Sequence, residues 1–178
     1  MGFYPPKHVA IIGAGFSGLS LALALHKVNI PSTIYKVRSA DFVQEGAVML
    51  SPNTLRVLDR LGGYERIRDK GYHFNNLTFK NDQNTTTAIY YFGHEELYGY
   101  KALRVYRQIL IDELKAILSE CGIEVKHNTK FSHIISESPK AVDFAFADGT
   151  TSSTSILIGA DGIHSTVLKY KYLTISPK

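Results

Sequence analysis

The chain has a single cysteine, no block of like charge and no apolar run long enough for a membrane span. Cys121 cannot form an internal disulfide alone, which is typical of proteins from a reducing compartment. The apolar run at residues 9–12 is too short to cross a bilayer, and no charged-then-apolar leader precedes it. We therefore predict a cytoplasmic protein without a membrane span.

The charged residues give no sign of a nucleic acid partner. Twenty lysines and arginines and 16 acidic residues are scattered along the chain, for a net charge of +4. The seven histidines show no metal-ligand spacing, and lone residues such as His127 and His164 are more typical of packed or surface positions. We expect neither a nucleic acid partner nor a metal site.

The first 37 residues predict a strand, a helix and a strand. "KHVAIIGAG" is a β-branched run that ends in glycines, "FSGLSLALALHKVN" places leucine and alanine at helical spacing, and "STIYKV" is again extended. This order is that of a βαβ unit, which places its two strands in a parallel sheet.

The remainder predicts further elements of mixed type. We expect a loop at residues 39–48, helices in "SPNTLRVLDRLGG", "YERIRDKG" and "RQILIDELKAILSECG", and antiparallel strands within residues 74–106. A strand "IEVKH", a hairpin from "FSHIIS" to "VDFAFADGT", a strand "TSILIGADG" and a helix from "IHSTVLKYK" follow. The fold class is thus α/β, with a Rossmann-like βαβ unit, a parallel sheet and an inserted antiparallel β portion.

Gly13, Gly15 and Gly18 form a G-x-G-x-x-G motif between the first strand and the helix. In this context the first glycine permits a tight turn, the second allows the backbone to approach a pyrophosphate, and the third allows close packing of helix on strand. The phosphates would lie at the positive N-terminus of the helix. We therefore predict a dinucleotide site.

The second strand ends differently from the usual pattern. An Asp or Glu is expected there to accept hydrogen bonds from the adenosine ribose, but the chain has Lys36, with Arg38 two residues later. An ammonium group offers no acceptor, although it can pair with a phosphate. Taken alone, these two cations favour the 2′-phosphate of NADP; the alternative is a surface substitution at a degraded site.

Four segments, in order, resemble the FAD-dependent group A flavoprotein monooxygenases, particularly the salicylate-hydroxylase-like branch. They are "VAIIGAGFSGLSLALAL", "GAVMLSPNTLRVLDRLG", "VYRQILIDEL" and "LIGADGIHSTV". The second glycine motif, Asp161-Gly162, distinguishes this family from NAD dehydrogenases. The resemblance implies FAD as cofactor, NAD(P)H as electron donor, and hydroxylation of an aromatic or similar small substrate.

The resemblance also implies site residues. The three glycines would hold the FAD pyrophosphate, Lys36 occupies the place of the ribose-binding Glu, and Arg38 matches a basic position at the adenosine end. The other matches are Gly46 and Ala47 in the loop near the flavin, Arg107 at the start of the long helix, Val125 on the strand near adenine, and Asp161 and Gly162 with Ser165 in their frame. No residue is predicted as a catalytic acid or base.

The chain departs from the family beyond Lys36. Leu168 stands where an arginine is usual, and the family continues for about as much chain again, including a Gly-Asp motif and most of the substrate domain. We therefore expect a truncated chain, with an FAD-binding domain at residues 1–72 and 102–178 and strands of a partial substrate domain at residues 73–101.

Three functional hypotheses follow. The chain is the FAD-binding part of a flavin monooxygenase, incomplete or weakly active by itself; or a stand-alone NADP(H)-binding module; or a non-catalytic remnant that acts as an interaction protein. The matches at Arg107 and Asp161-Gly162 favour the first. Under this hypothesis Lys36 is a lost ribose contact and FAD binding is weakened.

Overall fold

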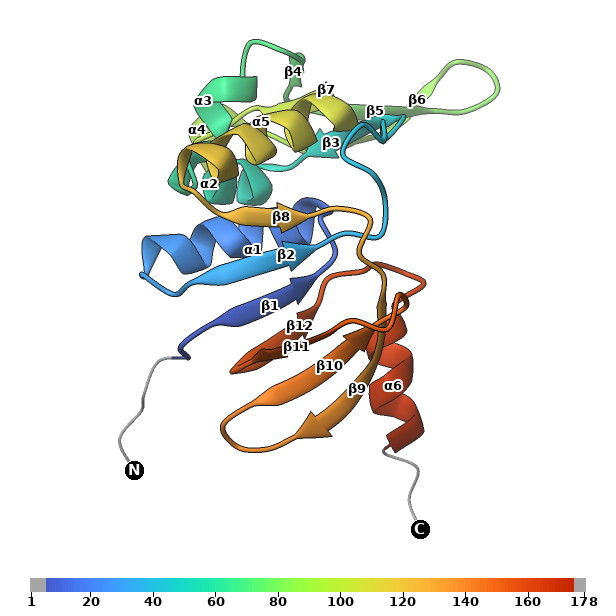
Figure 1. Cartoon of the computed structure of the whole chain (residues 1–178). Helices are drawn as coiled ribbons and strands as arrows, with labels where there is room; N and C mark the ends of the chain where they lie inside the picture. Colours follow the sequence, from blue (N-terminus) through green and yellow to red (C-terminus); the bar gives the residue numbers. More distant parts are fainter. Residues whose placement is uncertain (1–5, 175–178) are drawn as a thin grey trace. The chain divides into compact units, whose positions relative to one another are not determined.

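The computed structural model describes residues 6–174 and divides into two compact units. The first unit contains the chain up to residue 42 and from residue 115 onward, and the second contains residues 43–114 (Figure 1). These boundaries differ from those of the predicted functional domains, 1–72 with 102–178 and 73–101, and that functional division remains a prediction. Within residues 6–174, no helix is long and apolar enough to cross a bilayer.

A four-stranded parallel sheet forms the centre of the first unit. Its strands lie in the order β12-β1-β2-β8 (Figure 1), with bounds Ile156–Gly159, Val9–Ile12, Ser32–Tyr35 and Glu124–Lys126. All four residues of β1 are buried, as expected for an inner strand of a parallel sheet. Helix α1, Phe16–Lys27, buries Gly18, Leu19, Ala22 and Leu23. The predicted βαβ unit is confirmed.

An antiparallel sheet and a helix complete the first unit. Strands β9 (Phe131–Glu137), β10 (Val142–Phe146) and β11 (Thr151–Thr154) pair in sequence order, and helix α6 spans Thr166–Thr174. The aromatic side chains of Tyr35, Phe131, Phe144 and Phe146 form a buried cluster here.

The predicted hairpin is confirmed, but β11 was missed. Its sequence, "TSST", is entirely hydroxylic and resembles a turn. It is extended because it pairs with β10, with Thr154 opposite Val142. Thr154 is buried and its hydroxyl donates to the His8 carbonyl oxygen at 3.0 Å, so a distant partner determines its conformation.

The second unit has a three-stranded antiparallel sheet in the order β3-β7-β4, with bounds Ala47–Leu50, Ala102–Tyr106 and Tyr72–Phe74. Helices α2 (Pro52–Arg60) and α3 (Tyr64–Ile67) lie between β3 and β4 in sequence, and α5 (Arg107–Glu120) follows β7 and continues into the first unit. The loop predicted at residues 39–48 therefore ends too late, because its last two residues pair with β7.

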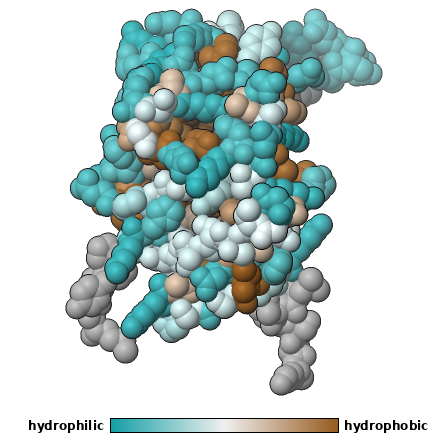
Figure 2. All heavy atoms as spheres, in the orientation of Figure 1, coloured by the Kyte–Doolittle hydropathy of each residue, from teal (hydrophilic) through white to brown (hydrophobic). Residues whose placement is uncertain are grey.

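A two-stranded ribbon extends from this unit. Strands β5 (Leu77–Lys80) and β6 (Thr86–Tyr90) are joined by a polar turn, which lies at the hydrophilic upper right of Figure 2. Asn81 stabilises that turn by accepting hydrogen bonds from the amides of Gln83 and Thr85. The short helix α4, Glu95–Tyr98, was not predicted, since four residues are too few to show helical periodicity.

Candidate cofactor-binding site

The glycine turn after β1 lies against the end of β12. The amide of Gly13 donates to the Tyr35 carbonyl oxygen at 2.8 Å. The amide of Ala160 donates to the Ile12 carbonyl oxygen at 2.7 Å. Gly13 has φ +117°, and an added Cβ would lie 2.2 Å from the Ala160 carbonyl oxygen. Both the backbone conformation and the approach of the second strand therefore require glycine at this position.

The other two glycines of the motif differ in their surroundings. A Cβ at Gly18 would lie 1.9 Å from the Gly13 carbonyl oxygen, so Gly18 allows α1 to pack on its own turn. A Cβ at Gly15 would have no heavy atom within 4 Å. Packing within the protein gives no reason for glycine at position 15, so the space beside it is free for a ligand.

The N-terminus of α1 begins at this open space. Gly15 is the N-cap residue, in an extended conformation, and no side chain caps the helix. The first turn contains no acidic residue. Its unpaired amides and the positive end of the helix dipole therefore favour an anionic group, and a pyrophosphate fits this chemistry.

Asp161 and Gly162 follow β12 at the same edge of the sheet. Asp161 Oδ2 accepts hydrogen bonds from the amides of Thr166 and Val167 at 2.7 and 3.3 Å, at the start of α6. The second oxygen, Oδ1, is buried and has no hydrogen-bond partner among the described residues. It is thus an acceptor available to a ligand hydroxyl or an ordered water.

Ser165 supports this turn. Its amide donates to the Gly162 carbonyl oxygen at 3.0 Å, and its hydroxyl oxygen accepts a hydrogen bond from the Leu168 amide at 2.9 Å. Gly162 has φ +85°, a conformation that favours glycine. These contacts fix the direction in which the chain leaves the sheet.

Lys36 lies at the end of β2, half-buried, with Arg38 exposed two residues later. Burial, followed by the charges of Arg38 and Lys115, lowers the pKa of Lys36. The Arg38 guanidinium lies over the Phe42 ring at 4.0 Å from its centroid. Neither the Lys36 nor the Arg38 side chain offers an acceptor to a ribose diol. The glycine turn thus suits the pyrophosphate of FAD, whereas these two side chains do not suit its adenosine ribose.

Val125 lies in the middle of β8 and pairs with Ile34 of β2. Its strand is therefore adjacent to the one that carries Lys36. The amide of Lys36 in turn donates to the carbonyl oxygen of Lys126, the residue after Val125, at 2.8 Å.

The remaining predicted residues meet in the second unit. The Arg107 amide donates to the Gly46 carbonyl oxygen at 3.0 Å, and a Cβ at Gly46 would lie 3.9 Å from Arg107 Cδ. Gly46 has φ +93°, and Ala47 pairs with Tyr106 at the start of β3. The turn before β3 and the start of α5 are thus joined by a backbone hydrogen bond.

The structure therefore forms two groups of the predicted residues. The first unit contains the three motif glycines, Lys36, Arg38, Val125, Asp161 and Gly162; the second contains Gly46, Ala47 and Arg107. Their roles toward a cofactor remain predictions. Sequence reasoning missed Lys115, whose charge acts on Lys36 although it lies 79 positions away; no local pattern could have revealed it.

Comparisons with known proteins agree with this geometry. Residues 7–175 match the family model described as FAD binding domain. The chain is 30% identical over 161 residues to a 3-amino-4-hydroxybenzoate 2-monooxygenase of Streptomyces platensis, covering 88% of this chain and 40% of the relative. It is 32% identical over 167 residues to the FAD-dependent monooxygenase subE of Metarhizium robertsii, covering 88% and 50%.

A solved structure with the same fold is p-nitrophenol 4-monooxygenase PnpA from Pseudomonas putida DLL-E4. Its TM-score is 0.82 at 20% sequence identity, covering 95% of this chain and 44% of that one. The chain thus spans about half or less of the length of these three proteins. From the family match and the paired glycine turns, we conclude that the chain belongs to the FAD-binding domain family found in flavin-dependent monooxygenases.

Proposed function

We propose that this chain is the FAD-binding portion of an NAD(P)H-dependent flavin monooxygenase that hydroxylates an aromatic or similar small organic substrate. The observation that carries the proposal is the meeting of two glycine turns, after β1 and after β12, beside the uncapped N-terminus of α1. The relatives support the reaction class, since one is named a 3-amino-4-hydroxybenzoate 2-monooxygenase.

Each group of residues has a part in this proposal. The amides at the start of α1 bind the pyrophosphate, and Gly15 leaves room for it. Asp161, held by the amides of α6, accepts a hydrogen bond from the cofactor or a bridging water. The role of Arg107, which belongs to the second unit, rests on the sequence resemblance alone. When bound, the flavin supplies the redox chemistry with NAD(P)H and oxygen, and the protein binds and orients it.

Lys36 sets the expected strength of binding. A carboxylate at this position would accept hydrogen bonds from the ribose, and each hydrogen bond to a charged group contributes about 1.5–3 kcal/mol. Its absence is expected to weaken FAD binding roughly ten- to a hundred-fold. Because the chain spans 40–50% of the length of its monooxygenase relatives, we expect little or no hydroxylase activity from it alone.

Titration of the purified chain with FAD tests the proposal, with flavin fluorescence and visible absorption as readouts. Saturable binding is expected, together with a loss of at least about tenfold in affinity for Gly15→Ala, because the added methyl group enters the space for the pyrophosphate. Gly63→Ala is the matched control: its Cβ makes only ordinary contacts, 3.6 Å or longer, in the second unit.

Circular dichroism establishes that each variant is folded. A folded wild-type chain that binds no FAD would refute the proposal and favour the non-catalytic remnant. Equal affinity of wild type and Gly15→Ala would show that FAD binds elsewhere. NAD(P)H-dependent product formation by the chain alone would contradict the expected lack of autonomous activity.

A further inference from the structure

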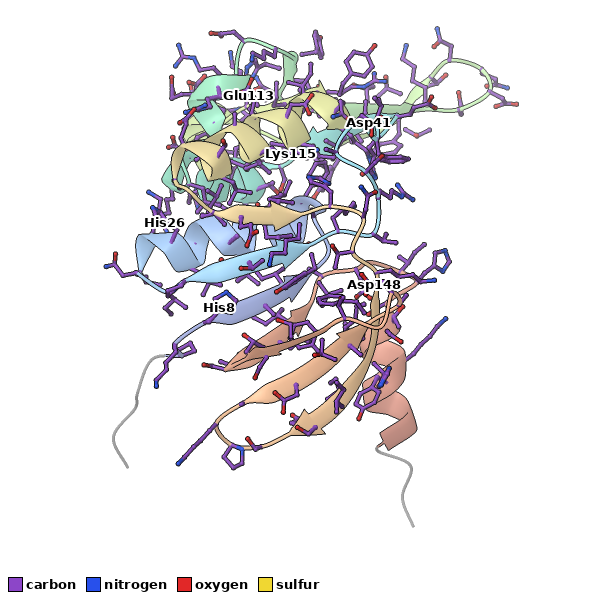
Figure 3. All side chains as sticks on the ribbon, in the orientation of Figure 1. His8, His26, Asp41, Glu113, Lys115 and Asp148 are labelled. Carbon is purple, nitrogen blue, oxygen red and sulfur yellow. The ribbon has the colours of Figure 1, made fainter. Side chains whose placement is uncertain are left out.

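Three cationic side chains surround the loop that leaves β2. Lys36 is the first residue after the strand, Arg38 follows two positions later, and Lys115 comes from α5, labelled in Figure 3. The Lys115 Nζ donates to the Ala40 carbonyl oxygen at 3.4 Å, which places this ammonium on the same loop. Residues far apart in sequence are thus combined at the end of one strand.

Backbone hydrogen bonds hold this loop in place. The Thr129 amide donates to the Lys36 carbonyl oxygen at 2.9 Å, and the Asn128 amide donates to that of Arg38 at 3.4 Å. The Lys36 amide is bonded to β8 as described above. The main chain between Lys36 and Arg38 is therefore tied to β8 and the turn after it, and both cations start from a fixed backbone.

Lys36, Arg38 and Lys115 form a cationic cluster, which has no carboxylate partner within 4 Å among residues 6–174. The nearest acidic residue in sequence, Asp41, labelled in Figure 3, accepts a hydrogen bond from Ser39, which lowers the pKa of its carboxyl group. Glu124 on the adjacent strand pairs with Lys126 instead, at 3.6 Å. Lys36 is half-buried beside two like charges, an arrangement that a bound anion would stabilise.

We propose that Lys36, Arg38 and Lys115 form a subsite for a phosphate monoester on the 2′-position of the adenosine ribose. This inference rests on the proposed dinucleotide binding at the α1 N-terminus, because the end of β2 then faces the ribose. The subsite prefers a 2′-phosphorylated dinucleotide to one with a free ribose diol, so FAD, which lacks this phosphate, binds without a contact here and with the reduced affinity given above. A guanidinium and two ammonium groups supply only donors, which match phosphate oxygens and offer no acceptor to hydroxyl groups.

The test compares ligands that differ in one phosphate. Binding of adenosine 2′,5′-bisphosphate and 5′-AMP is measured by isothermal titration calorimetry, together with NADP⁺ against NAD⁺ and with inorganic phosphate alone. The expected preference for each 2′-phosphorylated ligand is about tenfold or more, decreasing as salt is added. Inorganic phosphate is expected to bind far more weakly than the bisphosphate, since it lacks the contacts of the nucleotide.

Lys36→Glu is expected to remove this preference and to raise affinity for FAD, because it exchanges a phosphate partner for a ribose acceptor. Lys115→Gln is expected to reduce the preference without raising FAD affinity. Lys140→Glu makes the same charge change as Lys36→Glu at an exposed turn outside the cluster, and is expected to leave the preference unchanged.

The outcomes separate this inference from the proposed function. Equal affinity for the bisphosphate and 5′-AMP in a chain that binds FAD would overturn the subsite and leave the proposed function standing. A preference that survives Lys36→Glu, or inorganic phosphate that binds as tightly as the bisphosphate, would also overturn it. If the folded chain binds neither FAD nor any adenine nucleotide, both proposals fail.

Discussion

Replacement of Gly18 by alanine tests whether the glycine turn is built by close packing of backbone on backbone. The new Cβ would lie 1.9 Å from the Gly13 carbonyl oxygen and 3.4 Å from Ile11 Cγ2. Ordinary contact requires at least about 1.5 Å more, and the obstacle is main chain, which cannot rotate away. Either α1 or the turn must therefore move.

The cost follows from what α1 buries. Leu19, Ala22 and Leu23 are at most 3% exposed, so a displaced helix loses part of their packing. Overpacking of this kind typically costs about 1–3 kcal/mol, against at most about 1 kcal/mol gained from the helix propensity of alanine. In a chain of this size, a net loss of 1–2 kcal/mol lowers the melting temperature by roughly 2–8 °C.

Gly15→Ala is the internal reference, because it makes the same chemical change in the same motif without a clash. Urea unfolding followed by circular dichroism is expected to show a lower midpoint for Gly18→Ala, and a change within about 1 kcal/mol for Gly15→Ala, since it alters only the N-cap residue. If the two variants unfold at the same urea concentration, the distinction between packing glycine and ligand glycine is wrong.

Three further perturbations test the first unit. Burial lowers the pKa of His8 in the native state, so the unfolded chain binds more protons and the wild type loses stability as the pH falls through about 6.5. His8→Gln is expected to reduce this loss between about pH 7.5 and 5.5, as measured by urea unfolding at a series of pH values. Phe144→Ala is expected to cost about 3–5 kcal/mol in the same assay, because the ring is fully buried. Ser165→Ala removes the acceptor of the Leu168 amide and is expected to cost about 1 kcal/mol, again by urea unfolding.

Local sequence patterns correctly predicted those elements whose conformation depends mainly on their own residues. The β1-α1-β2 unit and α5 have the correct type and position, since each shows a clear apolar period and a glycine or asparagine near its end. The motif also located the glycine turn after β1, although its role toward a cofactor stays a prediction. Ser165 contacts Gly162, since its amide donates to the Gly162 carbonyl oxygen.

The elements that were missed depend on partners distant in sequence. β11 is extended because it pairs with β10, and the first half of β3 is extended because it pairs with β7, more than 50 residues later. Lys115 belongs to the candidate site only because the chain returns from α5 to the sheet through β8. Such placements follow from topology, and no period or spacing within a single sequence encodes them.

The glycine motif itself combines two requirements that the structure separates. Gly13 and Gly18 would be needed in a protein of this fold that bound nothing, since any Cβ there meets main-chain atoms. Gly15 has no such requirement, so its open surroundings are the part of the motif that indicates a ligand. Under the proposed subsite, Lys36 then distinguishes between ligands, since its charge favours a phosphorylated ribose over a plain one. Binding experiments on positions 15 and 36 are therefore more informative about function than substitutions at the other two glycines.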